Sequence, residues 1–182
     1  MNSVLSKLGI NGGIDFDIEE VGNPIPVVDL PVRVDGEFTN LNTGEIAQGK
    51  RIIIFALPGA FTPTCSTFQL PGFEEQYSSF LEKGIDEIYC LSVNDTFVMN
   101  AWFTAQGIEK VKALPDGSGS FTTGIGANVQ KDNLGFGLRS WRYAIVVNDG
   151  VIESVFSEDG FRDDADTDPY EVSSPENVLN NL

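Results

Sequence analysis

Apolar residues occur at two different spacings along the chain, and the change from one to the other predicts its strands and helices. Residues 51–57 (RIIIFAL) are apolar at nearly every position. Such a continuous run is typical of a central strand whose two faces are both covered by helices. Residues 85–93 and 111–114 predict two further strands, and Pro115 ends the second of them.

Helical spacing of the apolar residues separates these strands. Residues 65–83 carry an apolar stripe on one side and predict a helix, which Pro71 should kink or interrupt because proline removes a backbone donor and its ring clashes with the preceding turn. Residues 95–106 predict a second helix. Two shorter helices are expected at residues 120–124 and 175–182.

Two turn signals predict β-hairpins. Asp35-Gly36 lies within residues 32–38, and Asn148-Asp149-Gly150 lies between the apolar runs 142–147 and 151–156. Strands and helices therefore alternate first, and a hairpin and a last helix follow. This order predicts an α/β fold of the thioredoxin-like type, in which a mixed central β-sheet is flanked by helices on both faces.

Length and composition predict one globular domain. The 182 residues are 41% hydrophobic and 21% charged, which suffices for a sizeable core. Residues 1–20 are expected to form a weakly structured N-terminal extension, so the domain spans residues 21–182. No apolar run approaches the roughly 18 residues of a membrane span, and residues 1–13 lack the apolar core of a secretory signal. We therefore expect a cytoplasmic protein.

The net charge of −16 argues against nucleic acid and anionic membranes as partners. Acidic side chains are densest in residues 153–171, where Asp164, Asp166 and Asp168 imitate the start of a calcium loop. Pro169 stands at the sixth position, where such a loop needs glycine. The segment is therefore expected to be a solvated acidic loop, without a metal ion.

Candidate chemistry centres on Cys65, at the predicted start of the first long helix. A helix N-terminus offers free N–H groups and a positive dipole end, which favour a thiolate. The chain contains no histidine, which disfavours hydrolases that pair cysteine with imidazole. Thr62 stands where a Cys-x-x-Cys motif needs cysteine, which disfavours disulfide exchange. What remains is a lone thiolate that attacks a peroxide and becomes a sulfenic acid.

This reaction needs a cation and fixed hydrogen-bond donors around the sulfur and the peroxide. Thr62 lies one helical turn before Cys65 and can place its hydroxyl beside the sulfur. Pro58 and Pro63 stiffen the loop and limit the access of water.

The motif Pro58-x-x-x-Thr62-x-x-Cys65 resembles the active-site signature of the peroxiredoxins. Together with residues 70–73 (LPGF) and 91–95 (LSVND), it is similar to their type II, atypical two-cysteine group, which is peroxiredoxin-5-like. The resemblance runs from about residue 21 to the C-terminus. It implies that Cys65 is the nucleophile, that Thr62 orients peroxide and thiolate, and that Pro58 shields the site.

The resemblance also implies an arginine from a distant strand. Arg142 matches the catalytic arginine that favours the thiolate, and Arg139 matches a supporting one. The alternative is that both are surface charges capping a hairpin. Arg142 directly precedes an apolar run, so a buried guanidinium there would need an anionic partner, and the Cys65 thiolate would serve.

Cys90 has two interpretations. It lies within a predicted strand and can be a small core residue. Some relatives use the matching cysteine as a resolving thiol, which would require local unwinding, since disulfides join Cα atoms at most about 7 Å apart. Gln69 replaces a histidine found in many members, and the chain lacks the glutaredoxin module fused to some relatives.

The implied function is a thiol-dependent peroxidase that reduces hydrogen peroxide and organic hydroperoxides without a cofactor. Its electrons would come from glutathione with glutaredoxin, or from thioredoxin. A redox sensor or holdase, in which oxidation of Cys65 switches assembly, is the alternative, and a noncatalytic binding module is a third. The resemblance further implies a homodimer, with some of four aromatic residues at its interface rather than in the core: Phe61, Phe97, Trp102 and Trp141.

Overall fold

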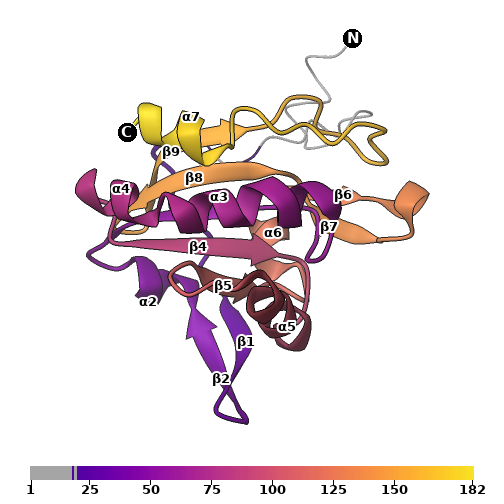
Figure 1. Ribbon diagram of the computed structural model, residues 1–182, viewed down its shortest axis with the longest axis horizontal. Helices are drawn as coiled ribbons and strands as arrows, with labels where there is room; N and C mark the ends of the chain where they lie inside the picture. Colours follow the sequence, from indigo (N-terminus) through magenta and orange to yellow (C-terminus); the bar gives the residue numbers. More distant parts are fainter. Residues whose placement is uncertain (1–17, 19) are drawn as a thin grey trace, which may run out of the picture.

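Five strands form the central sheet, in the order β5-β4-β3-β8-β9 (Figure 1). In the computed structural model, which describes residues 18 and 20–182, β3 (Arg51–Ala56) pairs in parallel with β4 (Glu87–Ser92), and β4 pairs in parallel with β5 (Lys112–Pro115). On its other side β3 pairs antiparallel with β8 (Tyr143–Asn148), which pairs with β9 (Val151–Ser157). The expected mixed sheet is thus confirmed, whereas the proposed N-terminal extension lies almost wholly outside the described residues.

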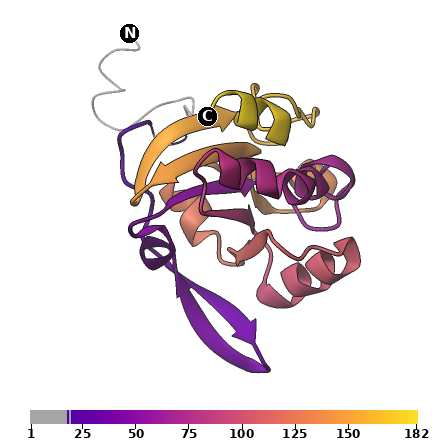
Figure 2. The ribbon, with the colours of Figure 1, turned by 60° about the vertical axis from the view of Figure 1, so that its left-hand side comes forward.

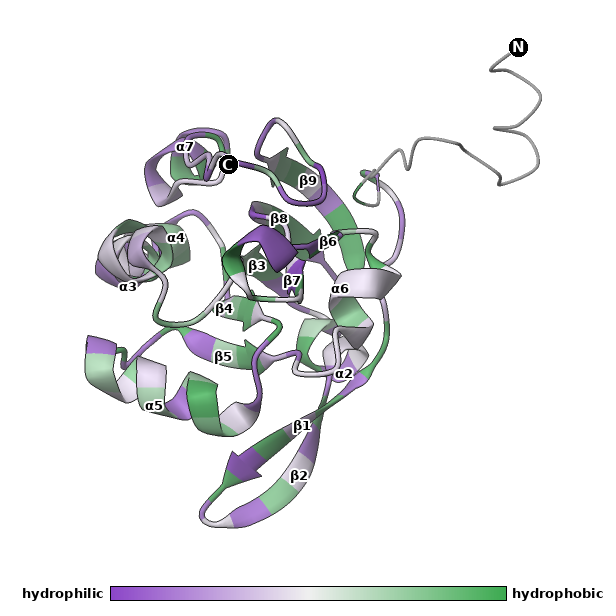
Figure 3. Cartoon of the chain, turned by 90° about the vertical axis from the view of Figure 1, so that its right-hand side faces the viewer, coloured by the Kyte–Doolittle hydropathy of each residue, from purple (hydrophilic) through white to green (hydrophobic). Residues whose placement is uncertain are grey.

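Helices cover both faces of this sheet, and the alternation of β3 shows how. Ile53 and Phe55 point into one core cluster, and Ile52 and Ile54 point into the other. Figure 3 shows hydrophobic residues along the strands of this sheet, with helices on either side of it. The first cluster packs against α3 (Leu70–Glu75), α4 (Tyr77–Glu82), α5 (Thr96–Gln106) and α7 (Pro175–Asn180), and the second against α2 (Thr43–Ala47) and α6 (Ser120–Gly124).

Both expected hairpins are present. Strands β1 (Asp29–Val34) and β2 (Glu37–Asn42) form a two-stranded ribbon that projects from the body of the molecule (Figure 2). Its turn residues have positive φ angles of 50° at Asp35 and 86° at Gly36, the conformation that aspartate and glycine tolerate best. No helix in the described part of the chain is long and apolar enough to cross a bilayer.

The predicted helix over residues 65–83 is not one regular helix, and the expected interruption near Pro71 is present. Its first turn is π-helical over η2 (Cys65–Gln69), where the Leu70 N–H donates to the Cys65 carbonyl five residues back. Pro71 lies in the first turn of α3, where its missing N–H costs little after the widened π turn. The helix is interrupted again at Gln76, between α3 and α4.

A short ribbon that the apolar pattern did not predict lies beside the sheet. Strands β6 (Asn128–Gln130) and β7 (Leu138–Ser140) pair antiparallel across the 3₁₀ turn η3 (Asp132–Leu134). The acidic loop docks on this ribbon: Asp163 accepts the Gln130 N–H at 2.7 Å, and Asp164 accepts the Asn133 N–H at 3.0 Å. The loop keeps its aspartates exposed, as expected of a solvated acidic segment, while two of them also fix it to the ribbon.

Buried Glu158 holds the other end of this loop. Its carboxylate accepts hydrogen bonds from the Glu171 N–H, and from both the N–H and the hydroxyl of Ser173, at 2.7–2.9 Å. These bonds satisfy a carboxylate that is only 4% exposed. The loop that carries Asp168 and Tyr170 is thus anchored to the body at both ends.

Candidate active site

Cys65 lies where the sequence predicts, in the first turn of the helix that follows β3. The helix begins at Pro63, and the Ser66 N–H donates to the Thr62 carbonyl at 3.0 Å. The Cys65 side chain has no exposed surface and packs in the same cluster as Phe55. Its thiol is therefore shielded from bulk water by the loop before the helix and by the residues that pack over it.

Arg142 reaches this thiol from the neighbouring strand. The β3–β8 register pairs Ala56 with Tyr143, so Arg142, one residue before β8, comes level with the end of β3 from which the active-site loop departs. Its Nη1 lies 3.5 Å from the Cys65 sulfur, and the residue is 1% exposed. The alternative that Arg142 is a surface charge is therefore wrong. Cys65 and Arg142 are 77 residues apart in the sequence, and the pairing of β3 with β8 brings them together.

Asp168 is an anionic partner of Arg142. Its Oδ1 lies 2.5 Å from Nη2, and its side chain is about half exposed. Burial opposes the charged form of Arg142, but the negative charges of the Cys65 thiolate and Asp168 outweigh it and raise the pKa of this arginine. Burial likewise raises the pKa of Asp168, but Arg142 and the Thr64 hydroxyl outweigh it and hold the value below the ordinary 3.8. Arg142 and Asp168 thus each stabilise the charged form of the other.

Two uncharged side chains complete the surroundings of the guanidinium. Gln69 is fully buried, and its Oε1 accepts a hydrogen bond from Arg142 Nη1 at 2.5 Å. The ring of Tyr170 lies 5.8 Å from the guanidinium carbon and stacks on Phe68. The glutamine found in place of histidine therefore acts as a neutral acceptor that orients Arg142. Its own Nε2 has no hydrogen-bond partner among the described residues.

The loop before Cys65 is tied to β7 by Arg139. Its Nη1 donates to the Pro58 carbonyl at 3.3 Å, and its Nε donates to the Phe136 carbonyl at 3.1 Å. A Cβ at Gly59 would lie 2.8 Å from Arg139 Nη1, so a larger residue there would displace the end of the Arg139 side chain. Burial lowers the pKa of Arg139, and the Cys65 charge opposes this effect. Arg139 thus contacts the loop backbone, whereas Arg142 contacts the sulfur.

The Thr62 hydroxyl faces the same site, and its oxygen can accept a hydrogen bond there. Its hydroxyl donates to the Gly59 carbonyl at 2.7 Å, so its lone pairs remain available to another donor.

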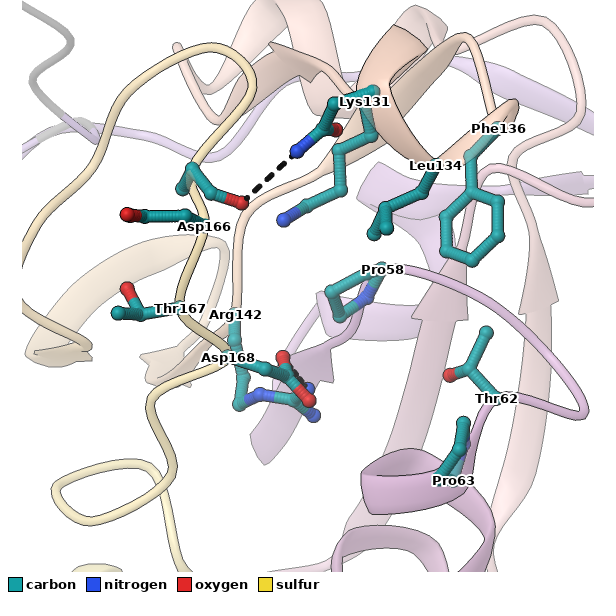
Figure 4. A pocket seen from close by; sticks show the side chains of 12 residues that line it. Pro58, Thr62, Pro63, Lys131, Leu134, Phe136, Arg142, Asp166, Thr167 and Asp168 are labelled. Atoms are coloured by element: carbon teal, nitrogen blue, oxygen red, sulfur yellow. Dashed lines mark hydrogen bonds and ion pairs between the residues drawn. The ribbon is translucent and has the colours of Figure 1, made fainter.

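A pocket of about 360 Å³ opens over these residues (Figure 4). Pro58, Thr62 and Arg142, three of the predicted site residues, line it together with residues from the β6–β7 ribbon and the acidic loop. Cys65 lies behind this lining, in contact with Arg142. The complete lining is Pro58, Thr62, Pro63, Lys131, Asn133, Leu134, Phe136, Arg142, Ala165, Asp166, Thr167 and Asp168.

Cys90 lies in the middle of β4, paired with Phe55 of β3, and has no exposed surface. Both cysteines are free thiols. Burial raises the pKa of Cys90 well above its ordinary value, and the nearby Cys65 charge adds to this shift. Cys90 is therefore held as a thiol within a packed sheet.

Three residues around the site could not be predicted from the sequence pattern. Asp168 and Tyr170 lie in a loop whose composition indicated only solvation, and Lys131 precedes a 3₁₀ turn in a ribbon too short to show alternation. The one usable signal was the combination of a carboxylate-rich segment with a buried arginine elsewhere in the chain. Among the described residues, no group of three or more Cys, Asp or Glu side chains is placed to hold a metal ion.

The fold and the site together define a class of protein, the thiol-based oxidoreductases. Residues 20–172 match the family model described as Redoxin. A protein named "Peroxiredoxin" from Rhizobium etli is 57% identical over 164 residues, which are 85% of this chain and 92% of that protein. The chain therefore belongs to the peroxiredoxins, and it is a thiol-dependent peroxidase.

Solved structures agree with this assignment. The Plasmodium falciparum antioxidant protein, described as a 1-Cys peroxiredoxin, superposes with a TM-score of 0.86 at 37% identity, over 90% of this chain and 100% of that one. Reduced Prx3 from Vibrio vulnificus, solved in complex with H₂O₂, gives 0.81 at 36% identity, over 90% and 96% of the two chains. The thioredoxin-like fold expected from the sequence is thereby confirmed.

Proposed function

We propose that Cys65 is the peroxidatic nucleophile and that Arg142 is the cation that supports it. The observation that carries this proposal is the 3.5 Å contact between Arg142 Nη1 and the Cys65 sulfur, behind the lining of the pocket. A guanidinium at this distance stabilises a negative sulfur and then the charge that develops on the peroxide oxygens. Trapping of a Cys65 sulfenic acid with dimedone, after one equivalent of peroxide, tests this assignment. The absence of an adduct on Cys65 would reject it.

Thr62 and Pro58 position the peroxide in this proposal. Thr62 accepts a hydrogen bond from the peroxide, since its own proton is donated to the Gly59 carbonyl. Pro58 shields the sulfur from water, with Arg139 holding its carbonyl. Because Cys65 has no exposed surface, the peroxide reaches it by a small displacement of the side chains between sulfur and pocket.

The substrates we propose are hydrogen peroxide and organic hydroperoxides. The similar Vibrio vulnificus protein was solved with H₂O₂. The pocket volume of about 360 Å³ far exceeds the needs of one H₂O₂ molecule, and Pro58, Pro63, Leu134 and Phe136 give it apolar walls. Space of this size and character suits the hydrocarbon part of an organic hydroperoxide.

The thiol reductant we propose is glutathione with glutaredoxin, or thioredoxin, acting from outside the chain. Cys90 is buried and protonated within β4, so it is a poor nucleophile toward a sulfenic acid on another element. The similar Plasmodium falciparum protein is described as a 1-Cys peroxiredoxin. Of the two interpretations of Cys90, these facts favour the core residue. Free thiols and a thiol donor suit the reducing conditions of the cytoplasm, where we place the activity.

Replacing Cys90 by alanine is therefore expected to leave peroxide turnover with the external thiol donor within about twofold of wild type. The loss of one buried sulfur should reduce the free energy of unfolding by about 1–2 kcal/mol. Steady-state peroxide consumption and urea denaturation measure the two effects. If turnover with thioredoxin alone is lost while turnover with glutathione and glutaredoxin persists, Cys90 is the resolving thiol and our assignment is wrong.

We propose a homodimer formed around the active-site loop and the start of α5. Phe61 and Phe97 are each 56% exposed, whereas Trp102 and Trp141 are buried in the core. The Ala60 N–H donates to Asn94 Oδ1 at 3.0 Å, so the segments carrying the two phenylalanines adjoin. Exposed aromatic side chains grouped in this way are typical of interfaces.

Sedimentation velocity at micromolar concentration should show the dimer, and Phe97→Lys should shift it to the monomer by placing charge in an apolar contact. Val27→Lys is the matched control, because Val27 is 67% exposed and packs against Gly44, beyond the proposed contact. A wild-type protein that sediments as a monomer would contradict the proposed dimer.

A further inference from the structure

Lys131 is a buried cation that the peroxidase chemistry described above does not use. It follows β6, and its residue is only 3% exposed. Its amine extends into the pocket that Pro58 and Arg142 also line (Figure 4). The Nζ atom lies 5.5 Å from the centre of the Trp141 ring, and it makes no hydrogen bond or ion pair with the part of the chain that the structure describes.

A lysine in this position lacks the partner that buried charges normally have. Burial lowers the pKa of Lys131 below its ordinary 10.5 and Arg142 adds to this, while Asp168, Cys65 and Asp164 oppose it. Neither carboxylate is free to pair with the amine, because Asp168 binds Arg142 and Asp164 accepts the Asn133 N–H. An anion that entered the pocket would supply the missing partner.

The walls of the pocket between this amine and the active site are apolar. Leu134 and Phe136 lie on the same ribbon as Lys131, and Pro58 and Pro63 face them from the active-site loop. The chain carries a net charge of −16, so an organic anion is repelled by the molecule as a whole. A fixed cation inside the entrance would counter that repulsion locally.

We propose that Lys131 binds the carboxylate of an organic substrate that reacts at Cys65. This inference rests on the proposed function, since it names the substrate class of the same pocket. The carboxylate pairs with the Lys131 ammonium, the hydrocarbon part lies along the apolar walls, and the reactive end points to Arg142 and Cys65. Lys131 is in this sense a specificity-determining residue.

Two substrates of the reaction could carry this carboxylate. In the first step the Cys65 thiolate attacks the terminal oxygen of ROOH, the O–O bond breaks, sulfur is oxidised to sulfenic acid, and RO⁻ takes up a proton and leaves as ROH. In the second step the sulfur of a thiol R′SH attacks the sulfenic sulfur, the S–O bond breaks, water leaves, and a mixed disulfide forms. The carboxylate belongs either to the hydroperoxide or to the thiol.

The test compares charged and neutral forms of each substrate. For the first step, an aliphatic hydroperoxide with a terminal carboxylate and its methyl ester are each mixed with reduced protein, and single-turnover oxidation of Cys65 is followed by dimedone trapping. For the second step, protein oxidised beforehand with H₂O₂ is mixed with mercaptopropionate or its methyl ester. In each step the rate constant for the acid is divided by the rate constant for the ester. This ratio is not affected by a general loss of activity in a variant.

The wild type is expected to favour the acid by about tenfold in at least one step, which is the effect of one charge-assisted hydrogen bond. In Lys131→Met, which keeps the length and apolar stem, that ratio should fall to about one, and Lys131→Arg should restore most of it. The step that shows the preference identifies the source of the carboxylate. A ratio near one in both steps for the wild type, or the same ratio in Lys131→Met, would overturn the proposal.

A binding measurement separates this inference from the peroxidase assignment. The hydroxy acid left after reduction of the hydroperoxide cannot oxidise Cys65, and its binding beside Trp141 should change tryptophan fluorescence. The dissociation constant should rise about tenfold in Lys131→Met and stay near the wild-type value in Lys131→Arg. Saturable binding that depends on Lys131, with no oxidation of Cys65 by H₂O₂, would reject the peroxidatic role alone. Binding that does not depend on Lys131 would reject the carboxylate site.

Discussion

Peroxide turnover is expected to fall by at least about 1,000-fold when Cys65 is replaced by serine, to the background set by uncatalysed reaction. A serine hydroxyl stays protonated at neutral pH and cannot act as the soft nucleophile that cleaves an O–O bond. The substitution removes the sulfur but keeps a small polar group that can accept a hydrogen bond from Arg142, which lies 3.5 Å away. The measurement is the loss of peroxide with an external thiol donor.

Cys90 provides the matched control for this experiment, because it is the other free cysteine and is equally buried. Cys90→Ser removes a thiol without touching the pocket, so turnover should persist while that of Cys65→Ser is lost. The thermal unfolding midpoint of each variant shows whether the fold is retained. If Cys65→Ser still consumes peroxide at a rate comparable with wild type, another group attacks the peroxide and the site is misassigned.

The central sheet could be predicted from the sequence because its signals are local. The run at residues 51–57 is apolar at almost every position, and the turn Asn148-Asp149-Gly150 closes a hairpin within a few residues. The peroxiredoxin signature from Pro58 to Cys65 is equally local, since one loop and one helical turn carry it. Each of these predictions needed no knowledge of what packs against the segment.

The rest of the site depends on contacts between distant segments. Asp168 becomes a partner of Arg142 only because a loop with many carboxylates folds back over the end of β8. Nothing in its neighbours distinguishes it from Asp166, which makes no contact with Arg142. Lys131 likewise becomes a buried cation through the docking of a three-residue strand, which is too short to show a pattern. The sequence shows which residues are charged, but it does not show which of them pair with one another.

The π-helical turn at Cys65 illustrates a different limit. Propensity and apolar spacing predict helix over residues 65–83, and they do not distinguish the wider π turn from an α turn. The effect of Pro71 is known from chemistry alone, and it predicts an irregularity in this segment. The π turn that precedes Pro71 begins at Cys65, the residue that we propose as the nucleophile.

Replacing Arg142 by methionine is expected to reduce the rate of Cys65 oxidation at neutral pH by about 10- to 1,000-fold. Methionine fills the buried space but removes the cation that stabilises negative charge on the sulfur and on the peroxide oxygens. The loss of the cation also leaves the Asp168 carboxylate near the sulfur. The sulfur should therefore react more slowly at neutral pH. The rates of sulfenic acid formation and of iodoacetamide alkylation at neutral pH measure the loss.

Asp168→Asn is the matched control, and the sign of its effect is opposite. Arg142 and Thr64 hold the pKa of Asp168 below its ordinary 3.8 despite burial, so this carboxylate is charged at every pH of the experiment, and its pairing with Arg142 is lost only as the pH falls below that value. Without it the guanidinium stabilises negative charge on the sulfur more strongly, and alkylation at neutral pH should speed up by less than about tenfold, since the carboxylate is half exposed. The double variant Arg142→Met/Asp168→Asn should lie between wild type and Arg142→Met. Equal alkylation rates for wild type and Arg142→Met would show that the 3.5 Å contact does not control the reactivity of the thiol.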